Sequence, residues 1–127
     1  MAQTLFPTIR FRDARAAIAW LEAALGAERL ALSEDDAGRV AHAEVRIGES
    51  TLMCGDRPEG IATAPGASVV YVVVPDADAA HARARAAGAS PTEIVEQDYG
   101  SRDFSLTDPD GNRWAIGTYP GVAAADA

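Results

Sequence analysis

The sequence predicts an α+β domain built from two βαβββ modules, each a curved, mixed four-stranded sheet with a helix on its outer face. The length of 127 residues and a hydrophobic content of 48% suit one domain with a core of ordinary size. A strand, a capped helix and further strand segments occur twice in the same order. From capping aspartate to closing glycine, the first helix spans Asp13 to Gly26 and the second Asp76 to Gly88.

The first module is expected over about residues 4–55. Alternating apolar and polar side chains predict a strand over Leu5–Phe11. Asp13 is a typical N-cap, and an apolar stripe predicts a helix over Ala14–Leu25 that ends at Gly26. Turn residues then separate three predicted strands: Glu28–Glu34, Val40–Gly48 and Ser50–Gly55.

The second module is expected over about residues 68–119, after a linker over 56–67 and before a tail over 120–127. It begins with the β-branched run Val69–Val74. Asp76 caps a helix over Ala77–Ala87. Three strands follow, with a strong turn signal at Asp108-Pro109-Asp110-Gly111 before the last: Ser90–Gln97, Ser101–Thr107 and Asn112–Thr118.

The sheet faces away from the helices are expected to form a trough that holds a small molecule. Period two assigns Ala41, Ala43, Val45 and Ile47 to the helix side and leaves His42 and Glu44 on the trough side. The candidate ligand-binding residues are Phe6, Thr8, Trp20, His42, Glu44, Met53, Tyr99, Arg102, Asp103 and Ala115.

Several of these residues have a second interpretation. His42 and Glu44 could act as an acid–base or metal-binding pair, or could be part of a polar sheet surface that Arg46 continues. Arg102 could bind an anion or make a structural salt bridge. Trp20 could contact a ligand or belong to the core or an interface. His81 is expected to be exposed and without a role, and Cys54 to be buried and unreactive.

Charge and composition narrow the class of partner. A formal charge of −8 argues against nucleic acid, which requires clustered cations. No apolar run is long enough to span a membrane, and the first residues do not resemble a signal peptide, so a cytoplasmic location is expected. All eleven basic residues are arginine, as in a GC-rich bacterial genome, and a single cysteine excludes an internal disulfide.

The segments "IRFRDARAAIAWLEAALGAERL" and "YGSRDFSLTDPDGNRW" resemble the opening and closing parts of the vicinal oxygen chelate superfamily. This superfamily includes glyoxalase I, extradiol dioxygenases, fosfomycin-resistance enzymes and bleomycin-binding proteins. The similarity covers about residues 4–119 and is greatest to the bleomycin-resistance or PhnB-like branch. It implies the glyoxalase/bleomycin-resistance fold and, as is usual in that branch, a homodimer.

The enzymes of the superfamily hold a divalent metal with His and Glu side chains from four strands. Matched to this chain, the resemblance puts Phe6, Met53, Val69 or Val70, and Ala115 at those positions. These side chains are poor ligands for the metals that the family uses, so neither a metal nor another cofactor is expected.

The resemblance and the apolar trough floor together predict a metal-independent protein that binds and sequesters a cationic or aromatic, antibiotic-like compound. No catalytic residue is assigned, and binding is favoured over catalysis. The alternative is an enzyme of the same superfamily, of lyase, isomerase or dioxygenase type, that uses His42 and Glu44 or a metal at a non-standard site.

Overall fold

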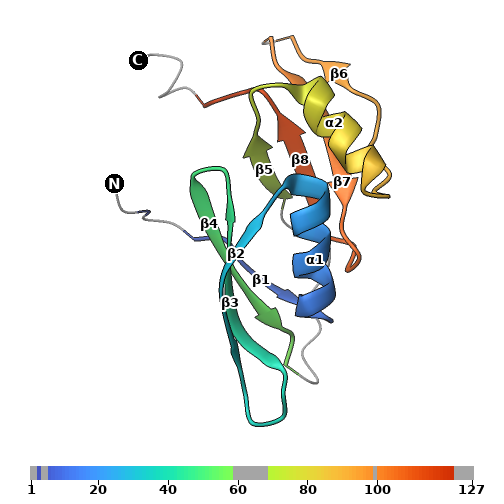
Figure 1. Cartoon of the computed structure of the whole chain (residues 1–127). Coiled ribbons are helices and arrows are strands. Elements are labelled where there is room, and N and C mark those ends of the chain that lie inside the picture. The colour runs from blue at the N-terminus through green and yellow to red at the C-terminus, as the bar shows by residue number, and fades with distance from the viewer. Residues whose placement is uncertain (1–2, 4–5, 59–68, 99, 122–127) are drawn as a thin grey trace. The chain divides into compact units, whose positions relative to one another are not determined.

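The computed structural model describes residue 3 and residues 6–58, 69–98 and 100–121, which divide into two compact units at Ala64 and Pro65. The first unit contains β1 (Thr8–Phe11), α1 (Ala14–Leu25), β2 (Glu28–Glu34), β3 (Val40–Ile47) and β4 (Ser50–Asp56) (Figure 1). The second contains β5 (Val69–Val73), α2 (Ala77–Ala86), β6 (Val95–Glu96), β7 (Arg102–Thr107) and β8 (Arg113–Gly117).

Each unit is a mixed four-stranded sheet with the same strand order. The first sheet runs β1-β4-β3-β2 and the second β5-β8-β7-β6. In each sheet the first strand pairs in parallel with the last, and the remaining pairs are antiparallel. The α+β class and the duplicated βαβββ order are therefore confirmed. Neither helix in the described part of the chain has the length and apolar content of a membrane span.

Helix α1 begins and ends where the sequence predicts. The Asp13 carboxylate accepts a hydrogen bond from the Ala16 amide, and Gly26 closes the helix at φ 68°, a left-handed conformation that favours glycine. Its buried residues form one stripe against the sheet: Ala14, Ala17, Ile18, Leu21 and Ala24. Opposite them lie the buried sheet residues of the first core: Phe11, Val40, Ala43, Val45, Leu52 and Cys54.

Strand β3 contains an irregularity that the alternation of its residues did not reveal. Ser33 pairs with His42, whereas the next residue of β2, Glu34, pairs with Val40, so Ala41 is an extra residue in β3. Such a bulge shifts the alternation by one residue. Val40 is therefore buried and Ala41 is exposed, and the expectation that Ala41 lies on the helix side is wrong.

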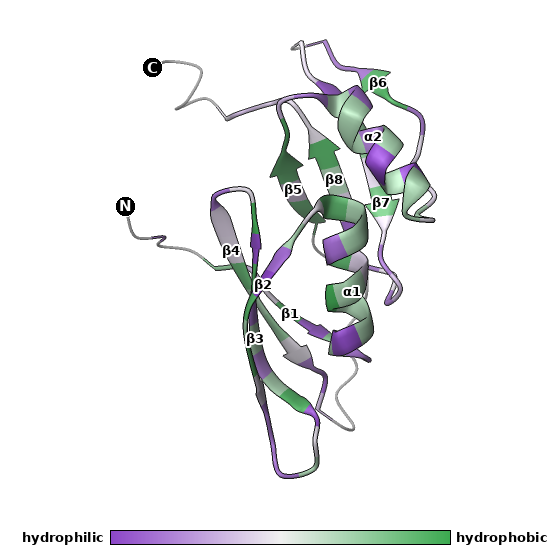
Figure 2. Cartoon of the chain, in the orientation of Figure 1, coloured by the Kyte–Doolittle hydropathy of each residue, from purple (hydrophilic) through white to green (hydrophobic). Residues whose placement is uncertain are grey.

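Helix α2 contributes small side chains to the core of the second unit, since its buried residues are Ala77 and Ala84. Larger side chains from β7 and β8 fill the space: Phe104, Leu106, Trp114 and Ile116. In Figure 2, β5 and β8 are among the most hydrophobic parts of the ribbon. His81 is half-buried, because its Nε2 donates to the Thr92 carbonyl at 2.9 Å and its ring lies edge-on to Phe104. The expectation that His81 is exposed is therefore wrong.

The strand predicted over Ser90–Gln97 is shorter, since only Val95 and Glu96 form β6. Pro91 has no amide hydrogen to donate to a neighbouring strand. Next to it, the Thr92 side chain replaces part of the ladder, because its hydroxyl accepts from the Ser105 amide at 2.8 Å. Asp56, assigned to the linker from the sequence, is the last residue of β4. Residues 59–68 of that linker and residues 122–127 of the tail lie outside the described residues.

Candidate functional site

The open face of the first sheet, opposite α1, brings predicted site residues from three strands into one row. Thr8 of β1 pairs with Met53 of β4, and Met53 pairs with Glu44 of β3. Side chains in register on neighbouring strands point to the same side of a sheet and contact one another. The row therefore places a hydroxyl, a thioether and a carboxylate side by side.

His42 lies next to this row on the same strand as Glu44. Its Nε2 is 3.0 Å from the Glu44 Oε2, and the two side chains are 42% and 36% exposed. They are the histidine–carboxylate pair that the sequence identified, and they contact solvent. Such a pair can hold a proton or bind a polar group of a ligand.

The other two candidates of this unit lie elsewhere. Phe6 precedes β1 and is 38% exposed. Trp20 is half-buried on α1, which covers the opposite face of the sheet from Thr8 and Met53. The structure does not bring Trp20 together with the row, and its role as a ligand contact stays a prediction.

The open face of the second sheet carries a hydrogen-bonded cluster of Tyr71, Ser101 and Asp103. The Tyr71 hydroxyl donates to the Asp103 Oδ1 at 2.9 Å and accepts from the Tyr119 amide at 3.1 Å. The Ser101 hydroxyl donates to the same carboxylate oxygen. Asp103 is a predicted site residue, and Ala115, another, is the register partner of Tyr71.

Gly117 makes this cluster possible. Tyr71 lies on β5 and Asp103 on β7, so their side chains must meet above the intervening strand β8. A Cβ at Gly117 would lie 1.8 Å from the Asp103 Oδ1 and 2.3 Å from the Tyr71 hydroxyl oxygen. Sequence reasoning missed Tyr71 and Ser101. The available signal was a single hydroxyl side chain in the otherwise all-valine segment of β5.

The structure places Arg102 among carboxylates on the helix side of its unit. Its guanidinium is 3.0 Å from Asp78 of α2 and 3.1 Å from Glu96 of β6. The hydrogen bond with Asp78, followed by that with Glu96, raises the pKa of Arg102 above its ordinary value. These contacts match the structural interpretation of Arg102. Tyr99, which the sequence placed at the mouth of the trough, lies outside the described residues.

The positions that the resemblance reserves for metal ligands do not fit a metal. By register, the partner of Met53 on the first strand is Thr8, not Phe6, and the partner of Ala115 is Tyr71, not Val69 or Val70. Neither pair includes the histidine or carboxylate that a divalent transition metal prefers. Within residues 6–58, 69–98 and 100–121, no group of three or more His, Cys, Asp or Glu side chains could hold a metal ion.

The sequence matches a known protein family over most of its length. Residues 4–116 match the family model of the Glyoxalase/Bleomycin resistance protein/Dioxygenase superfamily. The uncharacterized protein Mb0911c of Mycobacterium bovis is 31% identical over 123 residues, which cover 89% of this chain and 81% of that protein. Rv0887c of Mycobacterium tuberculosis has the same identity, with 72% of its length covered.

Solved structures have the same fold. A glyoxalase/bleomycin resistance protein from Catenulispora acidiphila is 28% identical, with a TM-score of 0.70 and coverage of 94% of this chain and 100% of that one. TnmS3, an antibiotic binding protein from Streptomyces sp. CB03234, is 21% identical, with a TM-score of 0.71 and coverage of 93% and 98%. At that lower identity the likeness to TnmS3 concerns the fold alone.

Proposed function

Because the chain belongs to the Glyoxalase/Bleomycin resistance protein/Dioxygenase superfamily, we propose that it is a metal-independent protein that binds a cationic or aromatic, antibiotic-like compound. The observation that carries the proposal is the row of Thr8, Met53 and Glu44 on the open face of the first sheet. An enzyme of the family would need several His and Glu ligands on such a face, whereas this row contains one carboxylate beside a thioether and a hydroxyl.

The chemistry of this row suits a flat cation. A methionine thioether makes favourable contacts with aromatic rings and adapts to their shape. The Glu44 carboxylate, held by His42 at 3.0 Å, supplies a negative charge next to that surface. In the second sheet, Tyr71 and Asp103 place an aromatic ring, in place of a thioether, beside a carboxylate. The fold shared with TnmS3, an antibiotic binding protein, is consistent with this proposal.

Titration of the purified full chain with a panel of cationic aromatic drugs, bleomycin among them, tests the proposal by calorimetry or tryptophan fluorescence. Met53→Ala and Glu44→Gln are each expected to weaken binding about fivefold or more, since each removes a contact with a charged or aromatic ligand. Glu49→Gln, the same change in an exposed turn residue, is the matched control. Equal affinities for all three variants and the parent would refute the role of the row.

A second candidate function rests on the geometry of His42 and Glu44. Their 3.0 Å contact would allow the imidazole to accept and release a proton in an enzyme of the same superfamily. Elemental analysis of protein purified without chelator separates the two functions. A stoichiometric transition metal in the parent protein that is absent from His42→Ala would favour the enzyme and overturn metal-independent binding.

The proposal includes a homodimer in the cytoplasm, as the resemblance and the sequence imply. Size-exclusion chromatography with light scattering measures the mass of the particle directly. A chain of 13.2 kDa should elute with about twice that mass if the dimer forms. A particle of monomer mass at micromolar concentration would contradict this part.

A further inference from the structure

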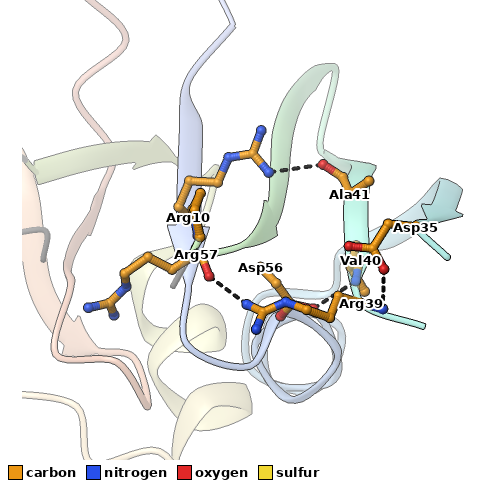
Figure 3. Close-up of a pocket in the computed structure, with 8 residues that line it drawn as sticks. Arg10, Asp35, Arg39, Val40, Ala41, Asp56 and Arg57 are labelled. Atoms are coloured by element: carbon orange, nitrogen blue, oxygen red, sulfur yellow. Dashed lines mark hydrogen bonds between the residues drawn. The ribbon is translucent and has the colours of Figure 1, made fainter. Parts of the chain in front are cut away.

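A pocket of about 410 Å³ lies within the first unit, at the ends of β1 and β4 and the start of β3. Its lining includes three arginines, two aspartates and three smaller or apolar residues (Figure 3): Arg10, Arg39, Arg57, Asp35, Asp56, Val40, Ala41 and Pro58. This concentration of arginine stands out in a chain whose formal charge is −8. The pocket contains no residue of the row formed by Thr8, Met53 and Glu44.

Backbone amides already engage the two carboxylates of the pocket. The Asp56 Oδ1 accepts from the Ala14 amide at 2.8 Å, and its Oδ2 accepts from the Val40 amide at 2.7 Å. The Asp35 Oδ1 accepts from the amides of Ala37 and Arg39 in the turn before β3. Both aspartates therefore organise the backbone around the pocket.

Two of the arginines are held by neutral groups. Among the described residues, the Arg10 Nη1 donates to the Ala41 carbonyl at 2.9 Å and the Arg39 Nη2 to the Arg57 carbonyl at 2.5 Å. By contrast, Arg15, Arg46 and Arg102 each contact a carboxylate within 3.1 Å. A carbonyl fixes the position of a guanidinium without neutralising its charge. Each of these contacts uses one of the five N–H donors that a guanidinium carries.

The backbone of β4 leaves room for the Arg10 side chain at Gly55. A Cβ at Gly55, the register partner of Arg10, would lie 2.3 Å from the Arg10 Nη1 and 2.9 Å from the Ala41 carbonyl oxygen. Glycine at this position therefore permits the guanidinium to lie across the strand. Figure 3 shows Arg10 extending towards Ala41, while the guanidinium of Arg57 points away from the other labelled side chains.

We propose that this pocket binds a small organic oxyanion, with a carboxylate or phosphate group held by Arg10 and Arg39. Guanidinium groups match the planar geometry of carboxylate and phosphate oxygens and bind them with two parallel hydrogen bonds. The volume of about 410 Å³ exceeds what a lone inorganic anion fills, so the ligand carries an organic body as well. This site is additional to the proposed binding of a cationic or aromatic compound.

The test is an NMR titration of the ¹⁵N-labelled full chain with benzoate, phenyl phosphate and the neutral isostere benzamide. Saturable shifts are expected for both anions at Arg10, at 39–41 and at 55–57, with little response to benzamide. Arg10→Gln combined with Arg39→Gln should weaken anion binding at least about tenfold, since hydrogen bonds to charged groups are lost. Arg46→Gln, the same substitution at a single arginine elsewhere on the first sheet, should leave it unchanged and is the charge-matched control for the single variant Arg39→Gln.

Arg10→Lys provides a variant that keeps the charge at this position. It should bind benzoate more weakly than the parent and more tightly than Arg10→Gln, because lysine lacks the planar fork. The single variant Arg39→Gln carries the test if the double variant does not fold. Shifts that match those of benzamide, or that persist in the arginine variants, would overturn the proposal. Neither result would affect the drug titrations, which depend on Met53 and Glu44.

Discussion

At the scale of single residues, Asp108 is a buried carboxylate on which the last hairpin depends. It accepts hydrogen bonds from the backbone amides of Asp110 and Asn112, from the Asn112 side chain, and from the Trp114 indole at 3.0 Å. Asp108→Ala would leave the buried Trp114 indole and the half-buried donors of Asp110 and Asn112 without that acceptor, and we expect a loss of about 3 kcal/mol in the free energy of unfolding.

Urea denaturation followed by tryptophan fluorescence measures this loss. Glu93→Ala, at an exposed position of the same unit, is the control and should change stability by less than about 0.5 kcal/mol. Asp108→Asn keeps one acceptor oxygen and should lie between the two. A midpoint for Asp108→Ala equal to that of the control would show that the turn does not need the carboxylate.

Cys54 gives a pH-dependent prediction. Burial, with a smaller contribution from Asp56 and partial opposition from Arg10, raises its pKa from 9.0 to about 11. At pH 8 the folded protein should react with a thiol reagent at least about a hundredfold more slowly than the protein in urea, because the thiolate is scarcer and covered. Equal rates would contradict the burial.

The same shift predicts how stability depends on pH. The unfolded chain ionises the thiol near pH 9.0 and the folded chain only near pH 11. The thiol therefore contributes its full stability below pH 9 and loses it between pH 9 and 11, by an amount on the order of 2 kcal/mol. Cys54→Ala should show a shallower fall over this window in urea denaturation. Identical pH profiles for the two proteins would argue against the raised pKa.

At the scale of elements, the two helix caps should contribute unequally to local order. Asp13 and Asp76 each accept a hydrogen bond from the third following amide at 3.1 Å. Removing such a cap costs about 1 kcal/mol. Helix α2 buries only alanines, whereas α1 buries Ile18 and Leu21, so α2 relies more on its cap. Asp76→Ala should therefore speed amide hydrogen exchange in α2 more than Asp13→Ala does in α1. Equal acceleration of exchange in both helices would show that side-chain packing does not compensate for the loss of an N-cap.

The elements themselves could be predicted because their signals are local. The N-caps, the stripe of α1 and the extent of β2 follow from residues close in sequence. The structure has the predicted bounds for α1 and β2, whereas α2 ends at Ala86, one residue before the predicted end, with Ala87 and not Gly88 as its C-cap. The bulge at Ala41 and the shortened β6 could not be predicted. Both depend on hydrogen bonds to a partner strand, such as the contact of Thr92 with Ser105, which periodicity does not describe.

At the scale of the whole molecule, the duplication extends to details that residue type alone does not reveal. Gly55 and Gly117 occupy corresponding positions on β4 and β8, and a side chain from a neighbouring strand crosses each: Arg10 in one unit and Tyr71 in the other. In both units a glycine on the intervening strand, which has no Cβ, leaves space for the two flanking strands to interact above it. In one copy it holds a cation, in the other a hydroxyl and a carboxylate.

The candidate site could be predicted only in part for the same reason. Period two correctly placed Thr8, Glu44, Met53 and Asp103 on open faces. The parallel register between strands more than forty residues apart decides which of these residues face each other. That register puts Thr8 opposite Met53, where Phe6 was expected, and Tyr71 opposite Ala115, where Val69 or Val70 was expected. The arginine pocket could not be predicted, because backbone carbonyls position its arginine side chains and residue types do not reveal such contacts.

The net charge of −8 should make the folded chain more stable in moderate salt. Like charges repel in the compact state, and raising the ionic strength from about 0.01 M to 0.15 M shortens the screening length from about 30 Å to about 8 Å. The described ion pairs of Arg15, Arg46 and Arg102 are exposed, and such pairs contribute little that salt could remove. We therefore expect Tm to rise by a few degrees in a thermal melt.

Sodium chloride and sodium fluoride should act equally, since screening depends on ionic strength and not on the anion. A fall in Tm would mean that the arginine–carboxylate pairs outweigh the net repulsion. A rise with only one anion would indicate specific binding in place of screening.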